Sequence, residues 1–166
     1  MAEMMKYIFF AAGLALAAPA LSAPDTDGSA AEHPEARPYE KDANASQNVD
    51  AALTRAVAAD KRVLLVMGAN WCHDSRGLAG WFEKPRFAAM LKSKYEVVYV
   101  DVGQRDRNID IAQRFGIEKI VGTPTVLVLS PRGALLNPKS APTWRNAASR
   151  DEADIFAYFD QFTPEL

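Results

Sequence analysis

The segment GANWCHDSRGL, residues 68–78, holds the only cysteine of the chain, Cys72, between a tryptophan and a histidine. A cysteine does chemistry as its thiolate, which attacks disulfide sulfurs. Three residues later, where a second cysteine would complete a redox pair, the sequence has Ser75. Three alternatives follow: a redox site with one sulfur, an inactive derivative of such a site, or a buried thiol.

The elements around this segment indicate how the thiol is placed. Residues 62–68, RVLLVMG, are an apolar, β-branched run, which predicts a strand buried on both faces. A helix follows to about residue 82, so Cys72 lies at a helix N-terminus, where free backbone N–H groups favour a negative sulfur. The Ser75 hydroxyl and a protonated His73 would add to this effect, whereas Asp74 would oppose it.

The alternative to a reactive thiol is a structural one. A free cysteine is among the most often buried residues and usually packs as a small hydrophobic side chain. Here the surrounding residues, NWCHDSR, are mostly polar. Strand-to-helix junctions at the carboxyl end of parallel strands are also where α/β folds place their sites. We therefore predict that Cys72 is reactive.

The rest of the chain predicts an α/β domain. Apolar residues at helical spacing predict a helix over residues 47–59, and apolar runs predict buried strands at 96–102 and 123–133. Helices alternating with buried strands indicate a sheet covered on both faces. The remaining predictions are a helix restarting at Pro85, a short helix closed by Gly116, a short fourth strand at 134–137, a loop at 138–149 and a closing helix at 150–162 capped by Ser149.

The order strand, W-C-x-x at a helix start, and a later G-T-P-T opening a strand resembles the thioredoxin superfamily. The resemblance covers about residues 46–162 and implies a three-layer α/β sandwich, with a central mixed sheet flanked by helices. It places Cys72 at the position of the attacking cysteine and Trp71 at the tryptophan before it. It also places Thr123 and Pro124 on the family's cis-proline loop, which lies against that cysteine and docks a peptide.

Two departures from the family pattern bear on activity. Ser75 replaces the resolving cysteine, which gives a CxxS motif, and Val66 stands where the family has a buried acid. With no second cysteine, the chain cannot close an internal disulfide. The resemblance implies a monothiol protein that forms a mixed disulfide on Cys72 with client protein thiols or disulfides, or with glutathione. An external thiol must then resolve it, as in an oxidoreductase or isomerase lacking the second cysteine.

A different class of function stays open. The cleft beside Pro124 could hold an extended peptide by strand-like hydrogen bonds while the thiol is incidental, which would make the chain a non-catalytic binding module. Trp144, in the expected loop, could pack over the domain or help to receive a client. A purely structural domain is the third alternative.

The N-terminus predicts export. Residues 7–23, YIFFAAGLALAAPALSA, are apolar and follow Lys6, and the run is shorter than the roughly 20 residues of a membrane span. We expect a signal peptide at 1–23, with cleavage near Ala23 or after Ser22, and no stable membrane insertion afterwards. An uncleaved anchor is the alternative. The split helices around EKPRF resemble exported bacterial thioredoxin-like proteins, so we expect a periplasmic location.

Composition and charge limit the domain organisation, the partners and the cofactors that the chain can have. The segment 24–45 is rich in Pro, Ala, Asp and Glu and predicts a flexible linker, with the thioredoxin-like domain at 46–166. The 166 residues carry a net charge of −2 without a basic stripe, which argues against a nucleic-acid partner. The two histidines, His33 and His73, show no metal-ligand spacing, so we expect neither a metal nor a cofactor. The oligomeric state is not fixed by the sequence.

Overall fold

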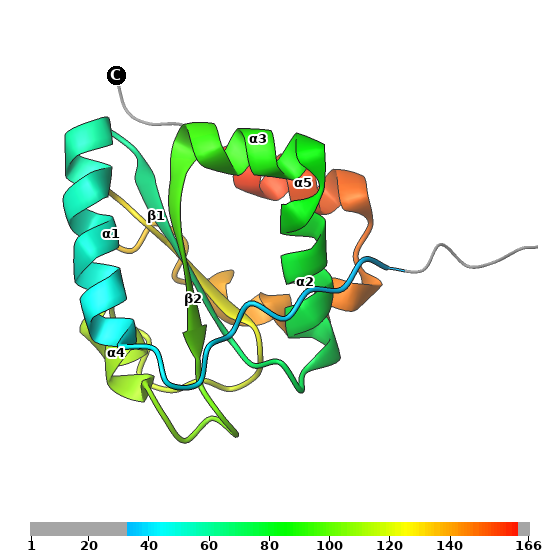
Figure 1. The fold of residues 1–166 in the computed structure, drawn as a ribbon, viewed down its shortest axis with the longest axis horizontal. Coiled ribbons are helices and arrows are strands. Elements are labelled where there is room, and N and C mark those ends of the chain that lie inside the picture. The colour runs from blue at the N-terminus through cyan, green and yellow to red at the C-terminus, as the bar shows by residue number, and fades with distance from the viewer. Residues whose placement is uncertain (1–32, 163–166) are drawn as a thin grey trace, which may run out of the picture. The chain divides into compact units, whose positions relative to one another are not determined.

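The computed structural model describes residues 33–162, so the expected signal peptide and the first part of the expected linker lie outside the described residues. Its centre is a three-stranded sheet of order β2-β1-β3. Strand β1 pairs parallel with β2 and antiparallel with β3, which confirms the mixed sheet (Figure 1). The strands are β1 at Arg62–Gly68, β2 at Tyr95–Asp101 and β3 at Thr125–Leu129.

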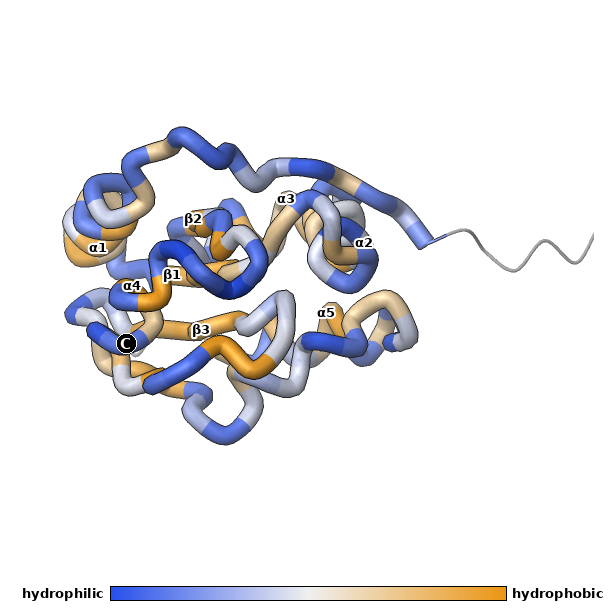
Figure 2. The backbone as a smooth tube through the Cα atoms, turned by 90° about the horizontal axis from the view of Figure 1, so that it is seen from below, coloured by the Kyte–Doolittle hydropathy of each residue, from blue (hydrophilic) through white to orange (hydrophobic). Residues whose placement is uncertain are grey.

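Helices cover both faces of this sheet, so every residue of the central strand β1 is buried. Alternate β1 residues point to opposite faces, as the pleat of a strand requires. Val63 and Leu65 pack with helix α1, whereas Leu64 and Val66 pack in the cluster that contains the helices on the other face. Figure 2 shows the apolar strands between these helices. The helices are α1 at Ala45–Ala59, α2 at His73–Glu83, α3 at Pro85–Lys94, α4 at Ile109–Arg114 and α5 at Glu152–Asp160.

Local sequence signals locate most element ends. Asn44 caps α1, and its side-chain oxygen accepts a hydrogen bond from the Gln47 N–H at 3.1 Å. Pro85 begins α3 at the first helical position, where the missing N–H costs nothing. Gly116 follows α4 with φ +89°, a left-handed conformation that glycine adopts without strain. These features confirm the predicted helices to within a few residues.

Three local predictions were wrong. The segment predicted as a loop at 138–149 contains a 3₁₀ helix, η1, at Ala141–Ser149. Trp144 lies within η1, is fully buried and stacks 4.7 Å from the Phe159 ring, so it packs in the core. The last helix begins after Asp151 rather than Ser149. Instead of a fourth strand, Leu135 forms an isolated bridge with Leu129.

Residues 33–44, which we call the strap, run from α2 across the front of β2 to α1 (Figure 1). Their composition predicted part of a flexible linker, but in the structure they pack on the domain. The Ala36 N–H donates to Arg76 O at 3.1 Å, and Asn70 exchanges two hydrogen bonds with the Tyr39 backbone. Tyr39 is 3% exposed. The strap is ordered because it buries an aromatic ring and pairs its backbone groups.

None of the helices within residues 33–162 combines the length and hydropathy needed to cross a bilayer.

Candidate functional site

The sheet register brings Cys72 next to the loop before β3. Cys72 follows the carboxyl end of β1, and Met67 near that end pairs with Thr125 at the start of the antiparallel β3. The loop that enters β3 therefore reaches the cysteine, and the Cys72 thiol donates a hydrogen bond to Thr123 O at 3.2 Å. The Thr123–Pro124 peptide bond is cis. Three of the predicted site residues thus lie together, although 51 positions separate Cys72 from Thr123.

Cys72 is the N-cap residue of α2, with φ −81° and ψ 122°. The residue is 8% exposed, so the cysteine is almost fully buried. The thiol donates its proton to the Thr123 carbonyl, and the Cys72 side chain makes no capping hydrogen bond to the start of α2.

Trp71 presents an apolar surface beside the sulfur. Its side chain is 51% exposed, and its Nε1 donates to Gly103 O at 2.8 Å, which fixes the ring against the loop after β2. An exposed tryptophan that is held in one orientation provides a contact area for a partner at little entropic cost.

Ser75 points inward, not toward solvent. It is fully buried, and its Oγ accepts a long hydrogen bond from the Ala69 N–H at 3.5 Å. A Cβ on Gly68 would lie 2.6 Å from both Ser75 Oγ and the Tyr39 hydroxyl oxygen, so the two hydroxyls converge on the end of β1. Burial raises the pKa of Tyr39 well above its usual range, which keeps the hydroxyl neutral. The resolving-cysteine position therefore holds a neutral, buried hydroxyl pair.

An ion cluster attaches the strap to the first turn of α2. Glu35 accepts hydrogen bonds from Arg76 Nε at 2.9 Å and Arg76 Nη2 at 3.1 Å, and its Oε1 lies 2.8 Å from His73 Nδ1. These bonds, first from Arg76 and then from His73, lower the pKa of Glu35 to about 2. The pKa of Arg76 is raised, chiefly by Glu35 and to a smaller extent by the charge of Cys72. Arg76 also donates to Trp71 O at 2.9 Å, so it supports the backbone that precedes the cysteine.

The structure thus adds residues to the site and gives His73 a different contact. His73 is 62% exposed at its side chain, and its bonded partner is Glu35; no hydrogen bond joins it to the sulfur in the described chain. Sequence reasoning missed Glu35 and Tyr39, because the composition of their segment indicated a linker. Arg76 lies four residues after Cys72, a helical spacing that could have been noticed.

Asp74 and Val66 are the remaining residues near Cys72 that the sequence singled out. Asp74 accepts a hydrogen bond from the Ala148 N–H at 2.9 Å, which ties η1 to the first turn of α2. Val66 is fully buried in the apolar sheet, so no carboxyl group stands at that position. Within residues 33–162, no group of three or more His, Cys, Asp or Glu side chains is arranged to hold a metal ion.

The pKa of Glu35 predicts the pH range in which the strap loses its ion pairs with α2. Because this pKa lies below its ordinary value of 4.5, the ties to Arg76 and His73 are complete above about pH 4.5 and are lost as the pH falls toward 2. We expect the NMR shifts of the Glu35 carboxyl carbon and the Ala36 amide to titrate together with a midpoint near pH 2. In the control Glu35→Gln, the Ala36 transition should vanish; a midpoint near 4.5 in the native chain would contradict the cluster.

Residues 44–131 match a protein-family model described as thioredoxin-like. The crystal structure of a disulphide isomerase from Xylella fastidiosa Temecula1 is similar, with 32% sequence identity and a TM-score of 0.70. The match covers 75% of this chain and 95% of that chain. A search of curated proteins gave no match. The fold, the cysteine at the head of α2 beside a cis-proline loop, and these similarities place the chain in the thioredoxin superfamily.

Proposed function

We propose that this chain is an exported monothiol thioredoxin-like protein that exchanges thiols and disulfides through Cys72. The observation that carries the proposal is the contact of 3.2 Å between Cys72 Sγ and Thr123 O at the start of α2. It places the sulfur at the head of α2 against the cis-proline loop, where a peptide would dock in this proposal. The similarity to a disulphide isomerase supports the same chemistry.

The reaction begins with the Cys72 thiolate attacking one sulfur of a client disulfide. A bond forms between Cys72 Sγ and that sulfur, the client S–S bond breaks, and the other client sulfur leaves with the electron pair and takes up a proton. A second thiol then attacks the mixed disulfide and releases Cys72. This second thiol is glutathione, another cysteine of the client or a partner protein's thiol.

The buried position of Ser75 supports the need for an external thiol. Its hydroxyl is a poor nucleophile toward sulfur, and it lies fully buried against Gly68 and Tyr39. The mixed disulfide on Cys72 is therefore not broken from within, and its lifetime depends on the concentration of the resolving thiol. This favours isomerisation, reduction or removal of glutathione over self-contained oxidation.

The proposed location is the periplasm. The apolar segment at residues 7–23 has the composition of an export signal, and an oxidising compartment supplies the disulfides that a single thiol can rearrange. In this proposal, the signal is cleaved near Ala23.

The test is the intact mass of the folded protein after incubation with oxidised glutathione. We expect one glutathione adduct, which reduced glutathione removes, and no adduct on Cys72→Ala. The rate of adduct formation in the folded chain should equal or exceed that of the chain in urea. If the adduct forms only after unfolding, Cys72 is a buried structural thiol and the proposal is wrong.

The low exposure of Cys72, 8%, favours one alternative function, a non-catalytic peptide-binding module. In that function the loop at Pro124 binds an extended segment and the sulfur takes no part. A client that co-purifies with the native chain and with Cys72→Ala in equal amounts would support this alternative. A client that is held only through a reducible bond supports exchange.

A further inference from the structure

A groove of about 430 Å³ lies beside the cis-proline loop. The similarities to known proteins assign no ligand to this groove. It is formed between the end of that loop and helix η1. Its lining residues are Val121, Pro142, Thr143, Arg145, Asn146 and Arg150.

The groove is lined by the same loop that contacts the Cys72 sulfur. Val121 precedes by two residues Thr123, whose carbonyl accepts the Cys72 thiol, and two extended residues span at most about 7 Å. Gly122 lies between them and lets Arg145 approach, since a Cβ there would come within 2.9 Å of the Arg145 Cβ and Cδ atoms. Arg145 therefore lies directly against the loop that positions Cys72.

The groove is positively charged in a chain whose net charge is −2. Arg105 joins the two lining arginines, because its Nη1 donates to Val121 O at 3.3 Å. Among residues 33–162, no carboxylate lies within ion-pair distance of Arg105, Arg145 or Arg150. Of the carboxylates near the site, Glu35 and Asp74 are already bound by Arg76 and by the Ala148 N–H, and Asp154 acts on the charge of Arg150 from beyond ion-pair distance.

Arg150 is held in place at the groove. It lies 4.1 Å over the Trp144 ring and donates to Thr143 O at 2.9 Å. Partial burial lowers its pKa, so its guanidinium is partly desolvated. A partly desolvated cation attracts a carboxylate more strongly than a fully hydrated one. Arg145 is exposed and makes no hydrogen bond among the described residues, so it is free to pair with a ligand.

One exposed apolar side chain lines the groove, and another precedes Cys72 in the chain. Val121 is 42% exposed on the groove, and Trp71 is 51% exposed beside Cys72. A partner that places a disulfide at Cys72 thus meets apolar contacts at the sulfur and arginines a few residues away. This is the arrangement of an interface with aromatic and arginine anchors.

We infer that the groove binds an acidic segment of a protein client next to its reactive disulfide. This inference rests on the proposed function, because it names the class of client that Cys72 attacks. The client's Asp or Glu side chains pair with Arg145 and Arg150 while one client sulfur bonds to Cys72 Sγ. The other client sulfur leaves as a thiol, so the exchange is balanced without a further oxidant or reductant.

The test uses three peptides that share one cysteine, activated as a 2-thiopyridyl disulfide, and differ in flanking Glu, Gln or Lys residues. Release of 2-thiopyridone gives the rate of mixed-disulfide formation. We expect the Glu peptide to react about tenfold faster than the Lys peptide at low salt, and the difference to shrink as salt screens the charges.

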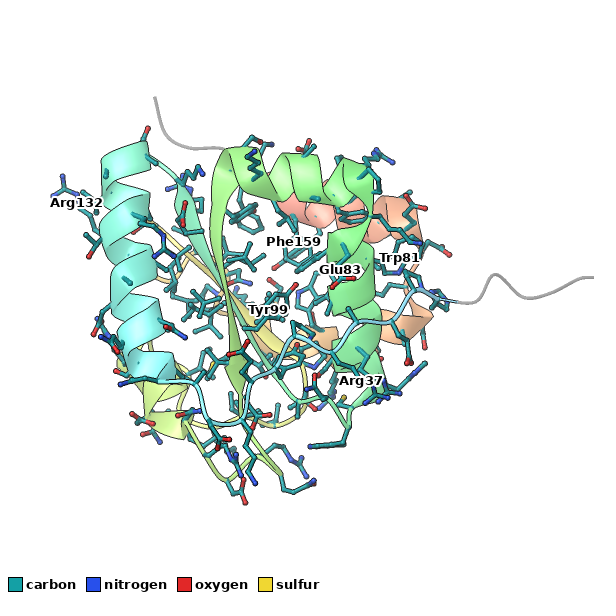
Figure 3. All side chains as sticks on the ribbon, in the orientation of Figure 1. Arg37, Trp81, Glu83, Tyr99, Arg132 and Phe159 are labelled. Carbon is teal, nitrogen blue, oxygen red and sulfur yellow. The ribbon has the colours of Figure 1, made fainter. Side chains whose placement is uncertain are left out.

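Arg145→Glu should remove or reverse this preference, so that the Lys peptide reacts at least as fast as the Glu peptide. The matched control is Arg132→Glu. Arg132 is exposed and lines a separate groove with Val57 and Arg62, at the opposite end of β1 from Cys72. Figure 3 shows Arg132 beside α1, on the opposite side of the view from Arg37, a residue of the strap whose Nη1 donates to Asn70 O at 2.8 Å. The control makes the same charge change and should keep the preference.

Equal rates for the Glu and Lys peptides, or a preference that Arg145→Glu leaves intact, would overturn the inference. The 2-thiopyridyl disulfide of glutathione has the same leaving group as the peptides. If it reacts as fast as the Glu peptide and loses the same rate in Arg145→Glu, the inference is also overturned, because the groove would then hold a tripeptide. If no peptide forms a mixed disulfide, the proposed function is wrong. The preference of the groove for acidic peptides is then tested separately, by fluorescence anisotropy of the Glu and Lys peptides on Cys72→Ser. Tighter binding of the Glu peptide supports the acidic preference, and equal binding of the two peptides overturns it.

Discussion

Ser75→Cys is expected to convert the chain from a monothiol to a dithiol protein. Oxidised glutathione should leave the native chain with one adduct, whereas the variant should lose two hydrogens and carry no adduct. The physical reason is that residues three apart at a helix start face the same side, which is the spacing of Cys-x-x-Cys redox pairs. The introduced thiol would attack the mixed disulfide on Cys72 and release glutathione, so that two glutathiones form for each internal disulfide.

The measurement is intact mass after oxidation, followed by the rate at which the oxidised protein accepts electrons from a dithiol peptide. The control is Ser46→Cys, which adds an exposed thiol at the start of α1, in the layer on the other face of the sheet. That variant should carry two glutathione adducts and no internal disulfide. A Ser75→Cys chain that also keeps two adducts would show that the buried hydroxyl pair with Tyr39 does not leave room for a resolving sulfur.

Gly80→Ala and Gly77→Ala are expected to change stability in opposite directions, although both lie in α2. Alanine favours a helix over glycine by about 1 kcal/mol at each position. At Gly77 the added Cβ would lie 3.5 Å from the Ala148 Cβ, which is ordinary contact. At Gly80 it would collide with the Pro34 carbonyl group and come within 2.6 Å of the Glu35 nitrogen, and these backbone atoms cannot rotate away.

We therefore expect Gly77→Ala to raise the free energy of unfolding by about 1 kcal/mol and Gly80→Ala to lower it by about 1–3 kcal/mol. Urea unfolding measures both. In Gly80→Ala the strap should also detach, with faster hydrogen exchange at the Ala36 amide that bonds to Arg76 O. If Gly80→Ala is as stable as Gly77→Ala and protects Ala36 equally, the strap does not pack tightly on α2.

The sequence by itself determined the parts of the molecule that depend on near neighbours. The apolar run of β1, the break at Pro85 and the turn after α4 follow from side-chain pattern and backbone preference over a few residues. The place of Cys72 at the start of α2 follows in the same way, because a strand end and a helix start are local signals. The resemblance carried by the WCxxS and GTPT segments added the nearness of Cys72 to Thr123.

Only the tertiary structure decided which distant groups meet at this site. Glu35 and Tyr39 belong to a segment with the composition of a linker, and its packing on α2 depends on a glycine at position 80 and on Arg76. The groove beside the cis-proline loop likewise depends on the close packing of Arg145 against Gly122. These contacts bridge about 20 to 45 residues of sequence, and their free energy comes from surfaces that exist only once the chain has folded. The pattern of neighbouring residues in the sequence therefore does not predict these contacts.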